Sequence, residues 1–341
     1  MKRSIVIACC LFSMQLNAQT KKVSFVENPK QQQVDVLVDG KPFTSFLYPG
    51  NLEKPVLYPL KTASGLTVTR GFPLNKQGSE RTDHPHHVGL WFNYESVNGL
   101  DFWNNSYNIP ADKKSKYGWI RNVKVTAVKP GVNKGSLEYA ANWEKQDQTV
   151  LLKEVTSFIF SGTDDTRTID RTTTLTAQKD TVYFKDVKDG MLGIRVTKEL
   201  ELPSDKEDAY TDHNGIVTKI SPSKNGATGD YLTSAGKKGN EAWGTRGSWC
   251  MLFGTKEKQA VSIAVIDHPK NPGYPTYWHA RDYGLFAANP LGQAIFSNGK
   301  EQLNLKLIPG ESVTFRYRIV ISSGKIQTAT TLNALSGEFG K

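Results

Sequence analysis

The chain has 341 residues, with 43 lysines and arginines against 33 aspartates and glutamates, and a formal net charge of +10 at pH 7. The basic residues are scattered, as at 113–114 and 237–238, and form no long basic run or recognisable module, so nucleic-acid binding is not expected. No apolar run reaches the roughly 20 residues that a membrane-spanning helix needs, so no membrane span is expected either.

The first 18 residues have the pattern of a secretory signal peptide. A basic start at 1–3 precedes an apolar run over 4–16 and a small residue, Ala18. We therefore predict a signal peptide over 1–18 and a periplasmic or secreted mature protein. A lipoprotein signal ending at Cys9 or Cys10 is the alternative. Only Cys250 would remain after cleavage, and its apolar neighbours are typical of a buried core residue.

Alternation of apolar and polar residues, which is typical of strands with one buried face, recurs along the chain. Residues 34–38 and 42–48 flank Asp39-Gly40, a pair that readily forms a tight hairpin turn. A second hairpin is predicted from 303–307 and 313–321. Further strands, rich in β-branched and aromatic residues, are predicted at 65–70, 137–143, 149–160, 168–177, 193–202 and 260–266. Beyond the signal, only 326–339 resembles a helix.

Many short strands separated by turn residues, without alternating helices, predict an all-β fold. The arrangement that fits is a large antiparallel β-sandwich, of which a mutarotase-like supersandwich is one form. The stretch over 221–240 is rich in Ser, Lys and Gly and indicates a long surface loop rather than a linker. We therefore predict a single β-sandwich domain over 21–323, followed by a helical tail over 324–341.

Five of the six histidines fall in two segments that are also rich in aromatic residues, 82–92 and 267–283. Alternate residues of an extended strand share a face, so His84 and His86 are predicted to point together while His87 points away. Such a pair is a candidate ligand set for one divalent metal ion, Zn, Ca, Mn or Fe. The ligand set would be completed by His279 and by one carboxylate among Asp83, Glu95 and Asp101. Alternatively, His84 and His268, each placed before proline, hydrogen-bond the backbone in tight turns.

A mechanism without metal is a second hypothesis. In it, His86 or His87 acts as general acid or base, His279 is the counterpart, and Arg281 stabilises negative charge on an oxygen. Aromatic rings beside these residues match the apolar faces of sugar rings; each ring alone is more typical of a core, and only their position beside His, Arg and Asp favours binding. The predicted substrate-binding residues are Arg70, Trp91, Asp101, Trp103, Tyr277, Trp278 and Asp282.

Three arginines, at 70, 195 and 246, interrupt apolar patterns. Substrate binding is predicted for Arg70, but the alternative for all three is a structural salt bridge to Asp170, Asp186 or Asp189. The sequence has no nucleophile elbow, phosphate-binding loop, dinucleotide fingerprint or zinc-protease motif, so the chemistries that depend on them lose support.

At these residues the chain resembles a family of secreted bacterial proteins, common in Bacteroidetes, that has carried the label "methane oxygenase PmoA" and is otherwise of unknown function. The resemblance covers most of the mature chain. The shared runs are Thr82-Asp83-His84-Pro85-His86-His87, 90–92, 101–103, 189–191, 193–195, 243–244, 267–269, 277–279, 281–286 and 288–290.

Such membership implies a periplasmic protein of polysaccharide or glycoside breakdown, since relatives look like neighbours of secreted sugar-acting enzymes. The methane monooxygenase subunit of similar name is an integral membrane protein, whereas this sequence lacks a spanning segment. The leading hypothesis is a secreted carbohydrate-active enzyme, a lyase or hydrolase, whose substrate is a small or oligomeric glycoside or keto-glycoside. A non-catalytic glycan-binding protein and a metal-dependent oxygenase are the alternatives.

Overall fold

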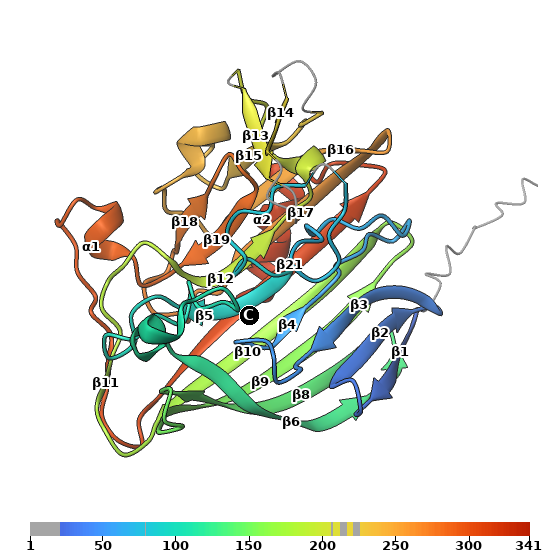
Figure 1. Ribbon diagram of the computed structural model, residues 1–341. Helices are drawn as coiled ribbons and strands as arrows, with labels where there is room; N and C mark the ends of the chain where they lie inside the picture. The colour runs from blue at the N-terminus through green and yellow to red at the C-terminus, as the bar shows by residue number, and fades with distance from the viewer. Residues whose placement is uncertain (1–20, 79, 206, 212–216, 221–225) are drawn as a thin grey trace, which may run out of the picture.

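The computed structural model describes residues 21–78, 80–205, 207–211, 217–220 and 226–341, and the predicted signal peptide lies outside them. The described residues form two large antiparallel sheets (Figure 1). In spatial order the first contains β18 (Tyr277–Ala280), β19 (Leu285–Asn289), β12 (Gly190–Arg195), β5 (Leu90–Tyr94), β4 (Val56–Leu57), β3 (Lys41–Leu47), β2 (Gln33–Val38), β1 (Lys22–Asn28) and β7 (Gly131–Val132). The second contains β15 (Asp230–Thr233), β16 (Trp249–Lys256), β17 (Gln259–Asp267), β21 (Ser312–Ser323), β10 (Thr166–Ala177), β9 (Val150–Gly162), β8 (Lys134–Glu144) and β6 (Trp119–Lys129).

Smaller elements connect these strands. They are the strand pairs β11 (Val182–Tyr183) with β20 (Lys306–Leu307) and β13 (Asp208–Thr211) with β14 (Val217–Ile220), the helices α1 (Gln293–Phe296) and α2 (Ala329–Phe339), and the 3-10 segments η1 (Ala111–Lys116), η2 (Lys198–Leu200) and η4 (Gly239–Ala242). None of the helices within the described ranges has the length and apolar character needed to cross a membrane.

Aromatic side chains from the two large sheets meet in one core. Phe46 of β3 stacks on Tyr139 of β8, with ring centroids 4.7 Å apart, and Phe92 of β5 packs against Phe315 of β21 at 5.7 Å. Cys250 of β16 is buried in the same core. The predicted all-β antiparallel sandwich is therefore confirmed.

One of the two predicted hairpins forms. Strands β2 and β3 pair around Asp39 and Gly40, whose φ angles of 51° and 73° suit a tight turn. The prediction of a second hairpin from 303–307 and 313–321 was wrong. Strand β21 pairs with β10 and β17, while β20 pairs with β11. The buried Asp186 carboxylate accepts hydrogen bonds from the backbone N–H groups of Leu303 and Asn304, which holds the chain before β20 away from β21.

A buried polar network crosses β8, β9 and β10 within this core. The Glu154 carboxylate accepts hydrogen bonds from Tyr139 Oη at 2.6 Å, Trp143 Nε1 at 2.7 Å and Arg171 Nη2 at 3.0 Å. The Arg171 guanidinium also lies 4.6 Å from the ring centroid of Phe92 on the facing sheet. An ion pair at this depth needs all of these partners, because a buried charge without them is very costly.

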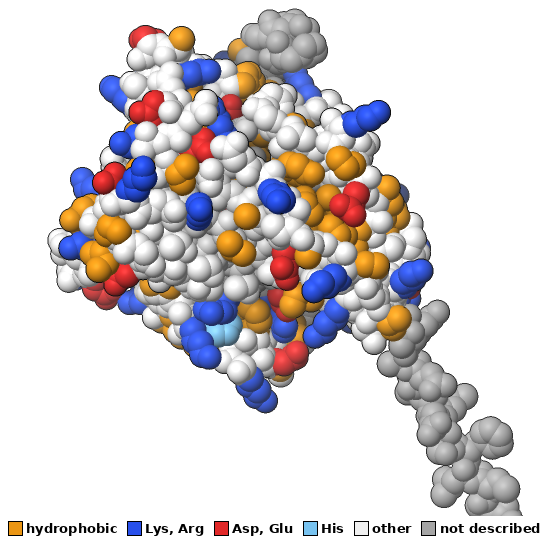
Figure 2. Space-filling model, turned by 90° about the horizontal axis from the view of Figure 1, so that it is seen from below, with side chains coloured by type: hydrophobic (Ala, Val, Ile, Leu, Met, Phe, Trp, Pro, Cys, Tyr) orange, Lys and Arg blue, Asp and Glu red, His pale blue; other side chains and the backbone are white. Residues whose placement is uncertain are grey.

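Basic side chains are spread among acidic and apolar ones on the face seen in Figure 2, rather than gathered over one area. This distribution agrees with the scattered basic residues of the sequence.

Asp267, at the end of β17, anchors the chain that leads into β18. Its buried carboxylate accepts hydrogen bonds from Asn271 Nδ2 at 2.7 Å and from Thr276 N at 2.9 Å. Burial raises the pKa of Asp267 to about 7, although both hydrogen bonds act to lower it. An unfolded aspartate has a pKa of about 4, so between about pH 4 and pH 7 the folded chain binds the additional proton.

Stability linked to Asp267 is therefore fully present below about pH 4 and is lost as the pH rises through about 7. We expect the melting temperature to fall between pH 5 and pH 8, and to fall less in Asp267→Asn, which stays neutral. Thermal denaturation across this range measures the effect, with the exposed Asp282→Asn as control. Equal slopes in wild type and Asp267→Asn would contradict the prediction.

Candidate functional site

Four strands of the first sheet place one row of residues on its outer face. Across β5, β12, β19 and β18 the register aligns Trp91, Gly193, Ala287 and His279. Their neighbours in the adjacent row point into the sandwich core, as Trp278 does. Because paired residues in a sheet share a face, Trp91 and His279 lie on the same surface with two small residues between them.

Gly193 makes room for two indole rings on this surface. An added Cβ would lie 2.5 Å from Trp91 Cζ2 and 2.9 Å from Trp103 Cη2, closer than side chains can approach. The two rings pack against each other with centroids 5.0 Å apart. The absence of a side chain at Gly193 therefore sets the position of both tryptophans.

We expect Gly193→Ala to displace these rings and to lower the free energy of unfolding by about 1–3 kcal/mol, as overpacked cores do. Thermal denaturation and tryptophan fluorescence measure both effects. The control is Gly337→Ala in α2, where no described atom lies within 4 Å of an added Cβ. Unchanged fluorescence and stability in Gly193→Ala would show that the rings can move without cost.

The segment that carries three of the histidines is a turn, not an extended strand. His87 N donates to His84 O at 3.0 Å, and His84 has a φ of 47°, in the left-handed region that is uncommon outside glycine. The prediction that His84 and His86 point together while His87 points away was therefore wrong. All three imidazoles cluster, with ring centroids 4.3 to 5.6 Å apart.

Four rings pack together in this cluster with nearly parallel planes. The His84 ring is within 5° of parallel to those of Tyr283 and His87, at 5.2 Å and 4.9 Å, and the Tyr283 and His87 centroids are 6.5 Å apart, so the three rings form a triangle. His87 in turn stacks on Trp91 at 5.2 Å. Trp91 is buried, whereas the side chain of His84 is 41% exposed. His84 is thus the member of the cluster that solvent reaches most readily.

Asp83 organises the turn. Its carboxylate pairs with His84 Nδ1 at 2.8 Å, Arg70 Nη1 at 2.8 Å and Arg195 Nη2 at 3.0 Å. Burial acts to raise the pKa of Asp83, but the hydrogen bond to His84 and the charges of Arg195 and Arg70 hold it well below the usual range. Asp83 is therefore a permanent carboxylate that orients the imidazole of His84.

Burial keeps two of the clustered histidines uncharged at neutral pH. It is the main cause that lowers the pKa values of His86 and His87 well below normal, and the nearby charge of Lys54 adds to the effect on His86. Arg195 Nη1 lies 3.2 Å from His87 Nδ1. Because a guanidinium only donates, this nitrogen of His87 accepts and the ring is neutral.

A second histidine–carboxylate pair comes from β18 and from the residue that precedes β12. His279 Nε2 lies 3.8 Å from Asp189 Oδ1, and His279 Nδ1 is buried with no hydrogen-bond partner among the described residues. Burial and the charge of Arg281 lower the pKa of His279 to about 3. Burial raises the pKa of Asp189, while the charges of Lys188, His84 and Arg281 act to lower it.

Tyr283 joins the two pairs. Its ring lies 4.8 Å from the Arg195 guanidinium and 5.5 Å from that of Arg281, besides stacking on His84. The site is therefore continuous from Asp83 and His84 to Arg281 and Asp189. It combines the uncharged imidazoles of His86, His87 and His279 with three guanidinium groups and aromatic rings, and such groups can bind a polar molecule and transfer protons.

The structure separates several of the predicted binding residues from this centre. Trp278 points into the core, because the residues next to His279 in β18 face the opposite side of the sheet. Tyr277 stacks on Phe296, with centroids 5.2 Å apart. Asp282 is exposed and caps its own turn through the backbone N–H of Tyr283.

Arg70 and Asp101 hold loops of the site together. Arg70 is buried, and besides Asp83 it donates to the backbone carbonyls of Asp83 and His84 at 2.9 Å. Asp101 accepts hydrogen bonds from Asn104 N and Nδ2, both at 2.8 Å. The alternative prediction that the three arginines pair with Asp170, Asp186 or Asp189 was wrong. Arg70 and Arg195 pair with Asp83, and Arg246 pairs with Glu301.

The side chains do not fit the predicted metal site. Among the residues that the structure describes, no three His, Cys, Asp or Glu side chains are grouped as ligands of one ion. Asp83, a candidate carboxylate ligand, is already bound to His84 and two arginines. We therefore derive no step that depends on a metal.

Sequence reasoning did not identify Tyr283, Asp189 or Lys54 as site residues. Lys54 is buried, donates from Nζ to His86 O at 2.8 Å and lies 5.6 Å from the Trp91 ring centroid. Burial lowers the pKa of Lys54 to about 8. Tyr283 could have been found by its spacing, two residues after Arg281, whereas no pattern in the sequence marks Lys54.

The fold and the site define a β-sandwich protein with a histidine-rich and aromatic-rich centre on the outer face of one sheet. The chain belongs to the family described as a family of unknown function, DUF6807, whose family model matches residues 33–336. A search of curated protein sequences finds no match to the chain.

Three solved structures illustrate what the chain is similar to. A galactose mutarotase-like protein from Clostridium acetobutylicum is 9% identical, with 88% of this chain and 98% of that chain covered and a TM-score of 0.36. A GH36 alpha-galactosidase from Geobacillus stearothermophilus is 11% identical, with coverage of 89% and 40% and a TM-score of 0.37. A glycoside hydrolase family 97 enzyme from Pseudoalteromonas sp. strain K8 is 11% identical, with coverage of 87% and 35% and a TM-score of 0.31. At these values the likeness carries no argument about activity.

Proposed function

We propose that the chain is a carbohydrate-active enzyme, a lyase or hydrolase that breaks the C–O bond of a glycoside or keto-glycoside by proton transfer at the Asp83–His84 pair. The observation that carries the proposal is this pair, in which His84 is exposed while Asp83 holds its Nδ1 at 2.8 Å. Nε2 of His84 is thereby left to exchange a proton with a substrate. The left-handed backbone at His84 is strain of the kind that clusters at active sites.

The proposed roles differ from those expected for the histidines. His84, a candidate metal ligand from its sequence, is in this proposal the acid–base group. The buried His86 and His87 pack against its ring. His279 and Asp189 form the second proton-transfer pair, and Arg281 stabilises negative charge that develops on an oxygen. Tyr283, which stacks on the exposed His84, provides an apolar face for a sugar ring.

A keto-glycoside gives this arrangement a balanced reaction. Its carbonyl acidifies the adjacent C–H, and His84 Nε2 takes that proton while the electron pair moves onto the carbonyl oxygen, facing Arg281. Collapse of the enolate then breaks the C–O bond at the next carbon, and the departing oxygen takes a proton from Asp189. Burial raises the pKa of Asp189, which favours its protonated form. A separate oxidoreductase would supply the keto group, and the predicted signal peptide would place the reaction in the periplasm or outside the cell.

The test is product detection by mass spectrometry with the signal-free protein and a panel of glycosides and their 3-keto derivatives. We expect cleavage by the wild type and a loss of about 10²–10⁴-fold in His84→Gln, the contribution typical of a general acid or base. His268→Gln, which alters a histidine packed against Phe339 away from the site, is the matched control.

Melting temperatures separate a catalytic loss from unfolding of the variant. If a glycoside binds but no product forms at any pH, the proposal of an enzyme fails and the chain is a glycan-binding protein. Full activity of a folded His84→Gln would refute the role of His84.

A further inference from the structure

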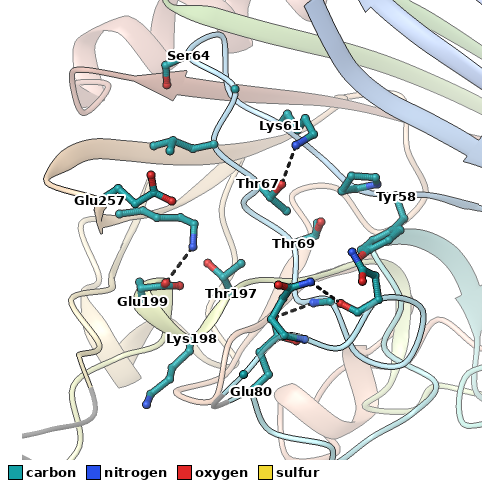
Figure 3. A pocket seen from close by; sticks show the side chains of 18 residues that line it. Tyr58, Lys61, Ser64, Thr67, Thr69, Glu80, Thr197, Lys198, Glu199 and Glu257 are labelled. Atoms are coloured by element: carbon teal, nitrogen blue, oxygen red, sulfur yellow. Dashed lines mark hydrogen bonds and ion pairs between the residues drawn. The ribbon is translucent and has the colours of Figure 1, made fainter.

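A pocket of about 790 Å³ lies apart from the histidine cluster, none of whose members lines it. Its walls come from residues within 58–71, from 75, 77, 78 and 80, from 197–199, and from the turn between β16 and β17. In Figure 3, Glu257 and Glu199 stand on one side of the pocket while Tyr58 and Lys61 stand on the other. Its volume lies within the range of about 300–1,000 Å³ that is usual for ligand sites.

The charges that line this pocket balance. The charged side chains are Lys61, Lys198 and Lys256 against Glu80, Glu199 and Glu257. Lys256 Nζ pairs with Glu199 Oε1 at 2.9 Å, and Lys61 Nζ donates to Thr67 Oγ1 at 3.0 Å. A site with this balance favours neither an anionic nor a cationic ligand, because either would meet like charges on one wall.

The remaining polar groups both donate and accept hydrogen bonds. Hydroxyl groups come from Ser64, Thr67 and Thr69, and amide groups come from Asn75 and Gln77. Sugar hydroxyls likewise donate and accept at once, so this lining matches a polyhydroxylated molecule better than a hydrocarbon or an ion. The Tyr58 ring lies at the wall but is itself buried, so the lining that a ligand would meet is mainly polar.

The loop that forms the lower wall is held in place before any ligand binds. The Glu80 carboxylate accepts hydrogen bonds from Gly71 N at 2.8 Å, Phe72 N at 3.1 Å and Gln77 N at 3.2 Å. An added Cβ at Gly71 would meet Asn75 O at 2.1 Å, so the loop is closely packed. Preorganisation of this kind reduces the entropy lost on binding.

From these observations we infer that the pocket is a binding site for a neutral oligosaccharide, separate from the histidine site. The inference does not rest on the chemistry proposed for His84, because it concerns binding alone. Arg70, between Thr69 and Gly71 of the pocket wall, binds Asp83 of the histidine turn. One saccharide chain held in the pocket would therefore lie beside the loop that carries His84.

The experiment measures binding of neutral trisaccharides to the signal-free protein by calorimetry and saturation-transfer NMR. The probes are maltotriose, cellotriose, xylotriose and laminaritriose, with trigalacturonate as the charged comparison. We expect at least one neutral probe to bind, and to bind at least about tenfold more weakly to Thr67→Trp, which fills the pocket, corresponding to about 1.4 kcal/mol. The matched control is Thr172→Trp, at an exposed position of β10 in the second sheet.

His84→Gln separates the two sites, and its binding of the probe is expected to be unchanged. If Thr67→Trp melts well below the wild type, Ser64→Trp at the exposed rim replaces it. No binding of any neutral probe would overturn the inference. So would binding that survives both pocket variants, binding that is lost in His84→Gln, or tighter binding of trigalacturonate than of every neutral probe.

Discussion

The substitution Asp83→Asn is expected to lower turnover of a cleaved glycoside by about 10²–10⁴-fold. The carboxylate of Asp83 fixes His84 through Nδ1 and receives hydrogen bonds from Arg70 and Arg195. An amide has one oxygen that accepts and an NH₂ group that donates, so it cannot accept from all three partners. His84 would lose its fixed orientation while two buried guanidinium groups lose part of their counter-charge. Steady-state kinetics with the substrate found by product analysis measure the loss.

A loss of this size has a structural explanation that must be separated from the catalytic one. Because the pKa of Asp83 is depressed in the folded chain, its ionised form contributes stability above its unfolded pKa, and Asp83→Asn gives up that contribution at neutral pH. Activity is therefore compared at a temperature at which circular dichroism shows both proteins folded. Asp282→Asn, in an exposed turn of the same site region, should retain activity. A folded Asp83→Asn with wild-type turnover would show that His84 needs no orienting carboxylate.

Glu154→Ala is expected to lower the free energy of unfolding by about 3–5 kcal/mol, the cost of removing one partner of a buried ion pair. It would leave Arg171 with a buried charge, and would leave Trp143 Nε1 and Tyr139 Oη without their acceptor. Urea denaturation followed by circular dichroism measures the change. Glu138→Ala, at a half-buried position of the neighbouring strand β8, should change stability by no more than about 0.5 kcal/mol.

A double variant shows which part of this cost comes from the stranded charge. Glu154→Leu combined with Arg171→Met removes both charges together, and apolar replacement of a buried pair is often nearly neutral. We expect it to be markedly more stable than Glu154→Ala alone. A double variant that is equally unstable would indicate that the hydrogen bonds of Trp143 and Tyr139, rather than the uncompensated guanidinium, stabilise the core.

Local patterns predicted much of the fold. Alternation and β-branched composition identified long strands such as 149–160 and 168–177, which correspond to β9 and β10, and Asp39-Gly40 identified a hairpin. Both signals depend on neighbours in the chain. Of the strand predicted over 303–307 only Lys306–Leu307 forms, as β20, because Asp186, distant in sequence, binds the backbone of Leu303 and Asn304. The stretch 65–70 forms only isolated bridges through Thr67 and Thr69.

The candidate site was predicted in its composition but not in its geometry. The sequence placed histidines, aromatic residues and Arg281 together, and the structure brings His84, His87 and Arg281 around Tyr283. It did not reveal that the histidine segment turns back on itself. Asp189 was named only as a partner for arginine and not as a site residue, because a lone carboxylate beside a strand has no signature until another strand lies next to it.

By itself, the sequence determined the all-β class and the two segments that contribute histidines, because strand periodicity and residue type are properties of the local chain. The tertiary structure alone decided which imidazoles are buried and which carboxylate orients His84. It also decided which tryptophans pack on the outer face of the first sheet and not in the sandwich core. These outcomes depend on the register of β5, β12, β19 and β18 and on the turn at His84. Register and burial arise from contacts between residues far apart in the chain, and they decide whether a histidine carries out chemistry or fills space.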